Sequence, residues 1–205
     1  MKTWNDEAGD WQDLPLSREA PHYEAIARIV NRFCPNGTIL DVGCGEAGLR
    51  AFLPAVRNYL GIEPSKKAAE SARAKCPQDR IVHITSEEFD AGQEKWDCIV
   101  FNEMLYYTTA PLALLRKFAR LLEPQGLIVI SIVQIPERSF RSRIFSWIPG
   151  SKMTNIRCTK VVHKYMIRNG WTIEVDDFVP VPGTEVHWRI LAAAPGMHAP
   201  NLQSD

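Results

Sequence analysis

The chain has 205 residues, of which 45% are hydrophobic and 23% charged, and its formal net charge at neutral pH is zero. This length is enough for a single domain with a full hydrophobic core. The balanced charge argues against a general nucleic-acid binder, which would carry a marked basic excess. We therefore expect one domain over residues 1–205, as a monomer or a homodimer.

The cysteines and the lack of long apolar runs indicate the cellular compartment of the protein. The five cysteines are scattered and form no C-x-x-C pair, which is typical of reduced thiols. No apolar run approaches the roughly 18 residues that a membrane span needs, and the first residues contain no apolar signal core. These patterns predict a cytoplasmic protein without a membrane partner.

The first half of the chain alternates between helical and strand-like patterns. Residues 1–21 are polar with two embedded tryptophans, which predicts an N-terminal arm, and Ser17 opens a helical pattern that runs to about Phe33. Apolar runs then predict four strands, at residues 38–42, 58–62, 81–84 and 97–101. Between them we expect a short helix over residues 49–53 and a helix over residues 66–75 that Ser65 caps.

The second half begins with a strong helix and ends with a hairpin. A helix over residues 111–122, a turn over 123–126 and a strand over 127–133 are predicted, with proline at the start of the helix. Residues 134–158 have no clear period and are interpreted as a lid insert, followed by a helix over 159–169. Two strand-like runs, 172–181 and 187–194, are joined by a turn so short that they must be antiparallel. Residues 195–205 are expected to form a flexible tail.

The alternation of strands and helices predicts the fold class. The strands are almost entirely apolar, which indicates that helices cover both faces of the sheet. We therefore expect an α/β fold with a Rossmann-like, doubly wound, seven-stranded, mostly parallel sheet, right-handed crossovers and a C-terminal antiparallel hairpin.

A glycine-rich loop after the first strand is the main functional signal. Gly43, Gly45 and Gly48 form a G-x-G-x-x-G pattern, in which the backbone can turn sharply and approach a ligand without a Cβ. Alone, this pattern is weak evidence for any particular ligand. Asp41 directly precedes the loop, and Glu63 ends the next strand, where a carboxylate can accept both hydroxyls of a ribose.

Four motifs together resemble the class I S-adenosylmethionine-dependent methyltransferases. They are Leu40–Gly45, Gly61–Ser65, Trp96–Tyr107 and Leu121–Gly126, and the resemblance covers about residues 20–194 in the right order. Within that family the chain is similar to small single-domain enzymes that act on natural products or saccharides, including the nodulation N-methyltransferases. Ala47 departs from the frequent family glycine, and we interpret it as a residue already turning into a helix.

The resemblance implies S-adenosylmethionine as cofactor and a set of residues that hold it. Loop N–H groups would bind its carboxylate, Glu63 its ribose, and Asp41 would brace the loop or reach the amine through water. Cys44 is expected for its small size and not as a nucleophile, and no metal is expected. The expected cofactor residues are Tyr23, Asp41, Gly43, Cys44, Gly45, Glu63, Pro64, Ser86, Glu87, Asn102, Glu103 and Leu105.

The methyl acceptor should bind at the carboxyl ends of the parallel strands, where the strand order reverses. The N-terminal arm, the insert 134–158 and the hairpin turn near 182–187 should cover that rim. Between residues 134 and 168 the chain has eight Lys or Arg and one acid. Two interpretations stay open for this segment: a solvated amphipathic lid, or a pocket for an anionic substrate with a carboxylate or phosphate.

The predicted reaction is direct displacement at an activated methyl, for which alignment and exclusion of water supply most of the acceleration. A hydroxyl acceptor would benefit from a base, and His187 and Tyr107 are the residues that we expect in this role, with Glu103 and His22 as further candidates. We expect methyl transfer to an oxygen or nitrogen atom of a small molecule, which could be anionic or aromatic: a natural product, a saccharide or another metabolite. The alternative is an RNA or protein methyltransferase, although a nucleic-acid partner is not favoured.

Overall fold

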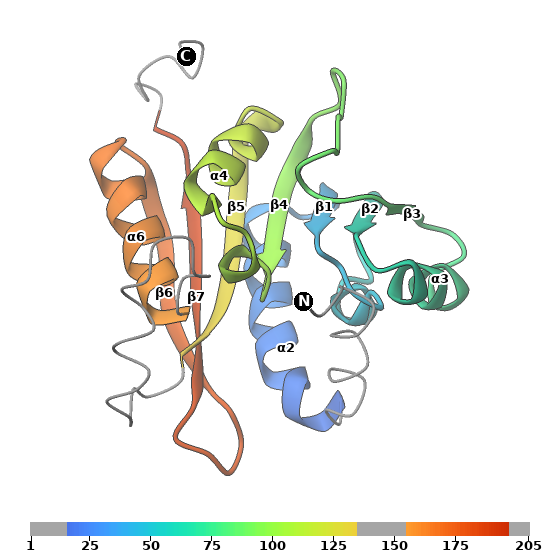
Figure 1. Ribbon diagram of the computed structural model, residues 1–205, viewed down its shortest axis with the longest axis horizontal. Coiled ribbons are helices and arrows are strands. Elements are labelled where there is room, and N and C mark those ends of the chain that lie inside the picture. The colour runs from blue at the N-terminus through green and yellow to red at the C-terminus, as the bar shows by residue number, and fades with distance from the viewer. Residues whose placement is uncertain (1–15, 135–154, 197–205) are drawn as a thin grey trace.

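The computed structural model describes residues 16–134 and 155–196, and the strands within them form one sheet (Figure 1). The strand order is β3-β2-β1-β4-β5-β7-β6. Strands β1 to β5 are parallel to one another, and β7 lies antiparallel between β5 and β6. The strands are β1 Thr38–Val42, β2 Asn58–Glu63, β3 Arg80–His83, β4 Trp96–Asn102, β5 Leu122–Gln134, β6 Thr172–Pro180 and β7 His187–Ala194. The predicted mostly parallel sheet with its C-terminal antiparallel hairpin is confirmed.

Helices cover both faces of this sheet because successive strand residues point to opposite sides. Ile39 of β1 belongs to the core under α2 and α3, whereas Leu40 belongs to the core under α4 and α6. The helices are α2 Leu16–Phe33, α3 Lys66–Lys75, α4 Pro111–Ala119 and α6 Asn155–Arg168, and the short 3₁₀ helices are η1 Gly48–Phe52 and η2 Leu105–Tyr107. The apolar character of both strand faces therefore reflects two separate cores.

Strand order reverses at β1, which lies between β2 and β4. From β1 the chain moves outward through β2 to β3, and then returns to β4 on the other side of β1. The connections that leave β1 and β4 therefore diverge at the carboxyl end of the sheet. In open α/β sheets, such a point is where ligands bind.

Several element boundaries differ from the predictions. Helix α2 begins at Leu16, so that residues 16–21 of the predicted arm are helical, and α6 begins at Asn155 within the predicted insert. The remainder of the arm and of the insert, and residues 197–205 of the predicted tail, lie outside the described residues. Helix α4 ends at Ala119, before the predicted limit.

The predicted turn over residues 123–126 lies within β5 as an irregularity. Trp96 pairs with Leu122, but Cys98 already pairs with Leu127, so four residues of β5 oppose one residue of β4. Proline and glycine in this stretch favour such a bulge as well as a turn. The predicted helix over 49–53 is instead the tighter η1, in which Leu53 N donates to Arg50 O at 3.1 Å.

Within residues 16–134 and 155–196, none of the helices has the length and apolar character needed to cross a membrane.

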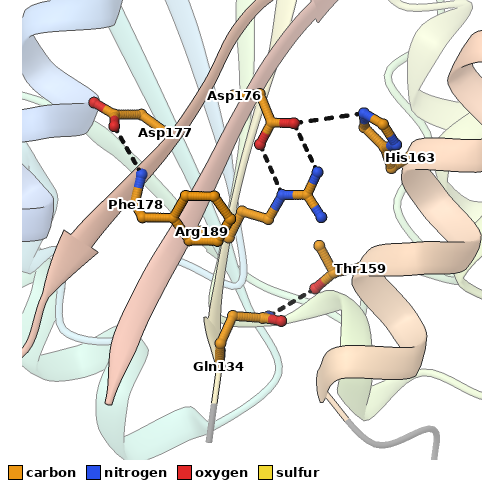
Figure 2. A network of polar contacts seen from close by, with 7 residues as sticks. All are labelled: Gln134, Thr159, His163, Asp176, Asp177, Phe178 and Arg189. Atoms are coloured by element: carbon orange, nitrogen blue, oxygen red, sulfur yellow. Dashed lines mark hydrogen bonds and ion pairs between the residues drawn. The ribbon is translucent and has the colours of Figure 1, made fainter. Parts of the chain in front are cut away.

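Polar contacts tie α6 to the C-terminal half of the sheet (Figure 2). Arg189 of β7 donates two hydrogen bonds to Asp176 of β6, at 2.7 and 2.6 Å, and this partner lowers the pKa of Asp176. His163 Nε2 of α6 lies 3.5 Å from the same carboxylate. Nearby, the buried Gln134 amide donates to Thr159 Oγ1 at 2.8 Å, which joins the end of β5 to α6.

We predict that Thr159→Val lowers the free energy of unfolding by about 1–2 kcal/mol, because it removes a buried hydrogen-bond partner without changing the side-chain volume. Urea unfolding monitored by circular dichroism measures this difference. The matched control is Thr172→Val at the start of β6, where the threonine is exposed. Equal effects of the two substitutions would contradict the role of the Gln134–Thr159 contact.

Candidate functional site

The glycine loop, residues 43–48, turns back on the neighbouring strand. The backbone N–H groups of Gly43 and Cys44 donate to the Ile62 carbonyl at 2.8 and 3.1 Å. Gly43 and Gly45 have φ of 73° and 55°, in the left-handed region that favours glycine. A Cβ added at Gly45 would meet no described atom within 4 Å. The loop is therefore open at Gly45, where a ligand can approach the backbone.

The second half of the loop packs against α2. Ala47 has φ of 59°, so it is not the helical residue that we predicted but a left-handed one with a Cβ. A Cβ at Gly48 would lie 3.0 Å from the Tyr23 hydroxyl, which shows why glycine is required there. The Tyr23 hydroxyl donates to Glu19 Oε2 at 2.8 Å. The structure thus brings the predicted residue Tyr23 against the loop.

Glu63, at the end of β2, holds the loop from the other side. Its Oε2 accepts a hydrogen bond from Gly45 N at 2.9 Å, and its Oε1 accepts one from Ser65 N at 2.8 Å. Burial raises the pKa of Glu63, and these two backbone donors oppose the shift. Each carboxylate oxygen has a further lone pair, so Glu63 can still accept hydroxyl donors from a ligand.

Cys44 fills a tight space beneath the loop. A Cβ added at Gly61 would lie 2.7 Å from Cys44 Sγ, so the thiol packs directly on the glycine of β2. Burial raises the pKa of Cys44 well above its usual value, which keeps the thiol protonated. Both observations support the small packing side chain that the sequence predicts.

Asp41 is buried with one oxygen unpaired. Its Oδ2 accepts a hydrogen bond from the Tyr59 hydroxyl at 2.6 Å, whereas Oδ1 has no partner in the described part of the chain. Burial raises the pKa of Asp41 to about 7. Since nearly all buried polar atoms in folded proteins have a partner, an unpaired carboxylate oxygen indicates a donor that a ligand supplies.

Two neighbouring side chains also have unpaired buried atoms. Both ring nitrogens of His22 and the Oδ1 of Asn102 are buried without a hydrogen bond of good geometry among residues 16–134 and 155–196, although the His22 ring interacts with the Asn102 side chain and the Glu19 backbone. The His22 ring is 1% exposed and stacks on Trp188 with centroids 4.3 Å apart. Burial lowers the pKa of His22 to about 4, and the neighbouring Asn102 side chain opposes this shift. His22 is therefore a neutral imidazole at pH 7.

Glu103 follows β4 in a left-handed conformation, with φ of 56°. Its carboxyl group accepts hydrogen bonds from the Tyr106 hydroxyl at 3.0 Å and from Ser131 Oγ at 3.4 Å. Burial raises the pKa of Glu103 to about 8, and both hydroxyls oppose the shift. A non-glycine residue in this conformation costs about 1–3 kcal/mol and occurs preferentially at functional sites.

Ser86 and Glu87, the expected cofactor residues after β3, lie in a loop that side chains hold in place. The Ser86 hydroxyl donates to Glu87 Oε2 at 2.8 Å, and Lys117 of α4 donates to the carbonyls of both residues. Pro64 is partly exposed beside Glu63, whereas Leu105 is fully buried in the core under α4.

The structure does not bring His187 and Tyr107 together. Tyr107 lies in η2 after β4, with its ring 4.5 Å from that of Tyr106. His187 begins β7, and its ring contacts Phe178 at 5.0 Å. Strand β5 separates the two strands from which they extend. The two candidate residues therefore extend from different parts of the sheet edge.

Three partners of the site were not predicted from the sequence. Tyr59, Glu19 and Ser131 were not singled out, although they bond to Asp41, Tyr23 and Glu103 respectively. For two of them, their positions in the sequence could have indicated the contact. Tyr59 pairs with Ile39 and so shares a strand face with Asp41, two residues farther on. Glu19 precedes Tyr23 by one helical turn.

Together these residues make an acceptor-rich site across three strand ends. The glycine loop follows β1, Glu63 ends β2, and Asn102 with Glu103 ends β4 on the opposite side of β1. The site can accept hydrogen bonds from hydroxyl groups on one side and from a cationic donor on the other. Over the described residues, no group of three His, Cys, Asp or Glu side chains is placed to hold a metal.

Comparisons with known proteins agree with this fold. A family model described as "Methyltransferase domain" matches residues 17–163. A ubiquinone biosynthesis O-methyltransferase from Histophilus somni (strain 2336) is 29% identical over 153 residues, which cover 69% of this chain and 61% of that protein. Another from Rhodopseudomonas palustris (strain BisA53) is 27% identical over 170 residues, which cover 69% and 66%. The chain thus spans less than two thirds of the length of these relatives.

Solved structures share the fold at low sequence identity. The magnesium protoporphyrin IX methyltransferase from Synechocystis PCC 6803, with bound S-adenosylhomocysteine, has a TM-score of 0.66 and 15% identity, over 96% of this chain and 89% of that one. The N-methyltransferase NodS from Bradyrhizobium japonicum WM9, with S-adenosylhomocysteine, has a TM-score of 0.66 and 17% identity, over 90% of each chain. With a family model that matches most of its length, the chain belongs to the methyltransferase-domain family, and its fold is that of the class I S-adenosylmethionine-dependent enzymes.

Proposed function

We propose that this protein is an S-adenosylmethionine-dependent methyltransferase that transfers a methyl group to an oxygen or nitrogen atom of a small molecule. The observation that carries the proposal is the acceptor-rich site around the open glycine loop. There, buried oxygens of Asp41 and Asn102 have no partner among the described residues. The curated relatives, which are named as O-methyltransferases of ubiquinone biosynthesis, support a small-molecule acceptor.

The residues present fit S-adenosylmethionine. The free lone pairs of Glu63 suit the two ribose hydroxyls, and the unpaired oxygens of Asp41 and Asn102 suit an ammonium group, which has three donors. The open backbone at Gly45 suits the part of the cofactor that lies between the ribose and the ammonium group. When bound, the cofactor supplies a methyl group on a positively charged sulfur. We assign Pro64, Ser86, Glu87 and Leu105 to the adenine side.

The remaining site residues would orient the reactants and exclude water. Tyr23 packs across the loop and is fixed by Glu19, which closes the side toward α2. His22 is neutral and buried, so it adds no positive charge beside a cationic cofactor. If the acceptor is a hydroxyl, Tyr107 is better placed than His187 to assist, because it follows β4 at the reversal of strand order.

The proposal includes the chemical class of the methyl acceptor and the cellular compartment. The basic composition of the insert, whose placement is not described beyond Gln134 and before Asn155, favours an acceptor that is anionic or aromatic. All five cysteines are free thiols, which supports a reducing compartment such as the cytoplasm. No feature of the described residues favours RNA or protein as acceptor.

Methyl-labelled S-adenosylmethionine incubated with the protein and fractionated metabolite pools tests the proposal directly. Mass spectrometry should detect a small molecule that carries the labelled methyl group and is missing when the protein is heat-denatured. Label found only in RNA or in protein fractions would favour the alternative acceptor class. Calorimetry without S-adenosylmethionine or S-adenosylhomocysteine binding would overturn the proposal.

We predict that Glu63→Gln weakens S-adenosylhomocysteine binding by at least about tenfold. A carboxamide can accept only one of the two backbone hydrogen bonds, and its NH₂ group faces a donor at the other, so that both the loop and the ribose contact are disturbed. Titration calorimetry measures the affinity. Glu70→Gln on the exposed face of α3 is the control, and unchanged affinity in Glu63→Gln would exclude the ribose assignment.

We predict opposite effects of Asp41→Asn on stability and on binding. The raised pKa of Asp41 means that the folded protein holds this proton more tightly than the unfolded chain. Stability therefore falls as the pH rises from about 4 to about 7. The variant should lack this decrease and be more stable than the wild type at pH 8 by roughly 1–3 kcal/mol, while binding S-adenosylhomocysteine more weakly.

Urea unfolding at pH 5 and pH 8 tests the stability effect, with Asp177→Asn on β6 as an exposed control. If wild type and Asp41→Asn show the same change in stability between the two pH values, Asp41 does not titrate in this range and the assignment is wrong.

A further inference from the structure

The Tyr59 hydroxyl and the Asp41 carboxyl meet beneath the glycine loop. Strand residues two apart lie on the same face, so Tyr59 of β2, which pairs with Ile39, shares a face of the sheet with Asp41 of β1. Asp41 itself pairs with Gly61, which offers no side chain as a partner. The Tyr59 hydroxyl instead donates to Asp41 Oδ2 at 2.6 Å. Both residues are buried, so water does not compete for this bond.

Arg50 helps to fix the ring that carries this hydroxyl. It lies in η1, directly after the glycine loop, and its Cζ is 5.7 Å from the centroid of the Tyr59 ring, within the range of a cation–π contact. Its guanidinium is itself held, because it donates to Asp79 Oδ2 at 2.8 Å and to the Leu53 carbonyl at 2.7 Å. The Tyr59 hydroxyl therefore meets Asp41 from a ring that is fixed in place.

Tyr59 acts on Asp41 as a hydrogen-bond donor. Burial and the charge of Asp41 raise the pKa of Tyr59 well above its usual value, so the hydroxyl keeps its proton. A hydrogen bond donated to a carboxylate favours its charged form, and this bond opposes the rise that burial causes in the pKa of Asp41. Tyr59 thus influences both the orientation and the charge of the carboxyl group.

The second oxygen of this carboxyl points to a ligand. Asp41 Oδ1 is buried and has no partner in the ranges that the structure describes. Buried polar atoms are rarely left in this state. If the Tyr59 bond served only to satisfy a buried acid, we would expect both carboxyl oxygens to be paired. One oxygen is held instead, and the other is left free.

The other titratable groups around Asp41 do not replace this bond. Four of them interact electrostatically with Asp41, from four places: Glu63 at the end of β2, Cys44 of the loop, Tyr23 of α2 and Cys98 of β4. None of these groups is a cation that would favour the charged carboxylate. The hydrogen bond from Tyr59 is the contact that lowers the pKa of Asp41 against the effect of burial.

We propose that Tyr59 is a positioning residue of the methyl-donor site, whose hydroxyl holds Asp41 with Oδ1 free to accept a hydrogen bond from the ammonium group of the donor. The inference rests on the proposed function and extends the site to a residue that acts through Asp41. No covalent step is involved. Because an ammonium group binds the charged carboxylate best, Tyr59 also sets the pH range in which the donor and its product bind.

Titration calorimetry with S-adenosylhomocysteine between about pH 5 and pH 8.5 tests the proposal. The affinity of the wild type should rise with pH through a midpoint at about 7, where Asp41 ionises in the free protein. Tyr59→Phe removes the hydroxyl and keeps the ring. Its midpoint should lie about one pH unit higher, and its affinity at pH 7 should be at least about fivefold weaker.

Two further variants serve as controls. Tyr165→Phe on α6, which packs against the other core, is the matched substitution and should behave as wild type. In Asp41→Asn the midpoint should disappear, and Tyr59→Phe added to it should cause no further change with pH. This comparison also separates the titration of Asp41 from that of Glu103, whose pKa of about 8 lies in the same range.

Carbon-13 NMR of the Asp41 carboxyl measures its pKa without a ligand, and this pKa should also rise in Tyr59→Phe. A Tyr59→Phe protein that is folded by circular dichroism and keeps the wild-type midpoint would overturn the inference while the proposed function stands, even if it binds more weakly at every pH. A midpoint that persists in Asp41→Asn would overturn it as well, whether or not Tyr59→Phe folds. If the wild type binds neither S-adenosylhomocysteine nor S-adenosylmethionine, the proposed function fails and the inference fails with it.

Discussion

The hydrogen bonds from Gly45 and Ser65 to the carboxylate of Glu63 are the contacts on which the site depends. The Gly45 bond fastens the loop after β1 to the end of β2, at the point where the strand order reverses, and the Ser65 bond holds the carboxylate in place. The loop can then remain open at Gly45 although three of its residues have left-handed φ. One acid thus helps to hold the loop and also presents free lone pairs to a ligand.

Buried carboxyls on both sides of this loop indicate a site that is adapted for binding at the expense of stability. Burial raises the pKa of Asp41 to about 7 and that of Glu103 to about 8, so both groups are easily protonated in the free protein. A cationic ligand would return each to its charged form, and its binding energy would offset the cost of burial. The left-handed residues Ala47 and Glu103 add local strain at the same place.

The sequence predicted the fold well because apolar strands and their connecting helices leave strong local patterns. Glu63 at the end of β2 and the capping role of Ser65 follow from such patterns, and Ser65 Oγ does accept from Ala68 N. Ser131 was not predicted as a partner, because it approaches Glu103 only through tertiary folding, whereas the i,i+4 spacing of Glu19 and Tyr23 on α2 could have been used. The stretch 123–126 was wrongly predicted as a turn, since proline and glycine favour a turn and a bulge alike. Ala47 was misjudged because its conformation is imposed by the loop and not by its own preference.

A crystal structure of the protein with S-adenosylhomocysteine bound would show how a ligand lies across the glycine loop. We expect the ribose hydroxyls within hydrogen-bonding distance of the Glu63 carboxylate, and the ammonium group against the oxygens of Asp41 and Asn102 that are unpaired in the free protein. Glu63 should keep its bonds to Gly45 and Ser65 in the complex. A ligand bound with its amino-acid end toward β2, or one that leaves these oxygens of Asp41 and Asn102 unpaired, would show that the proposed site is wrong.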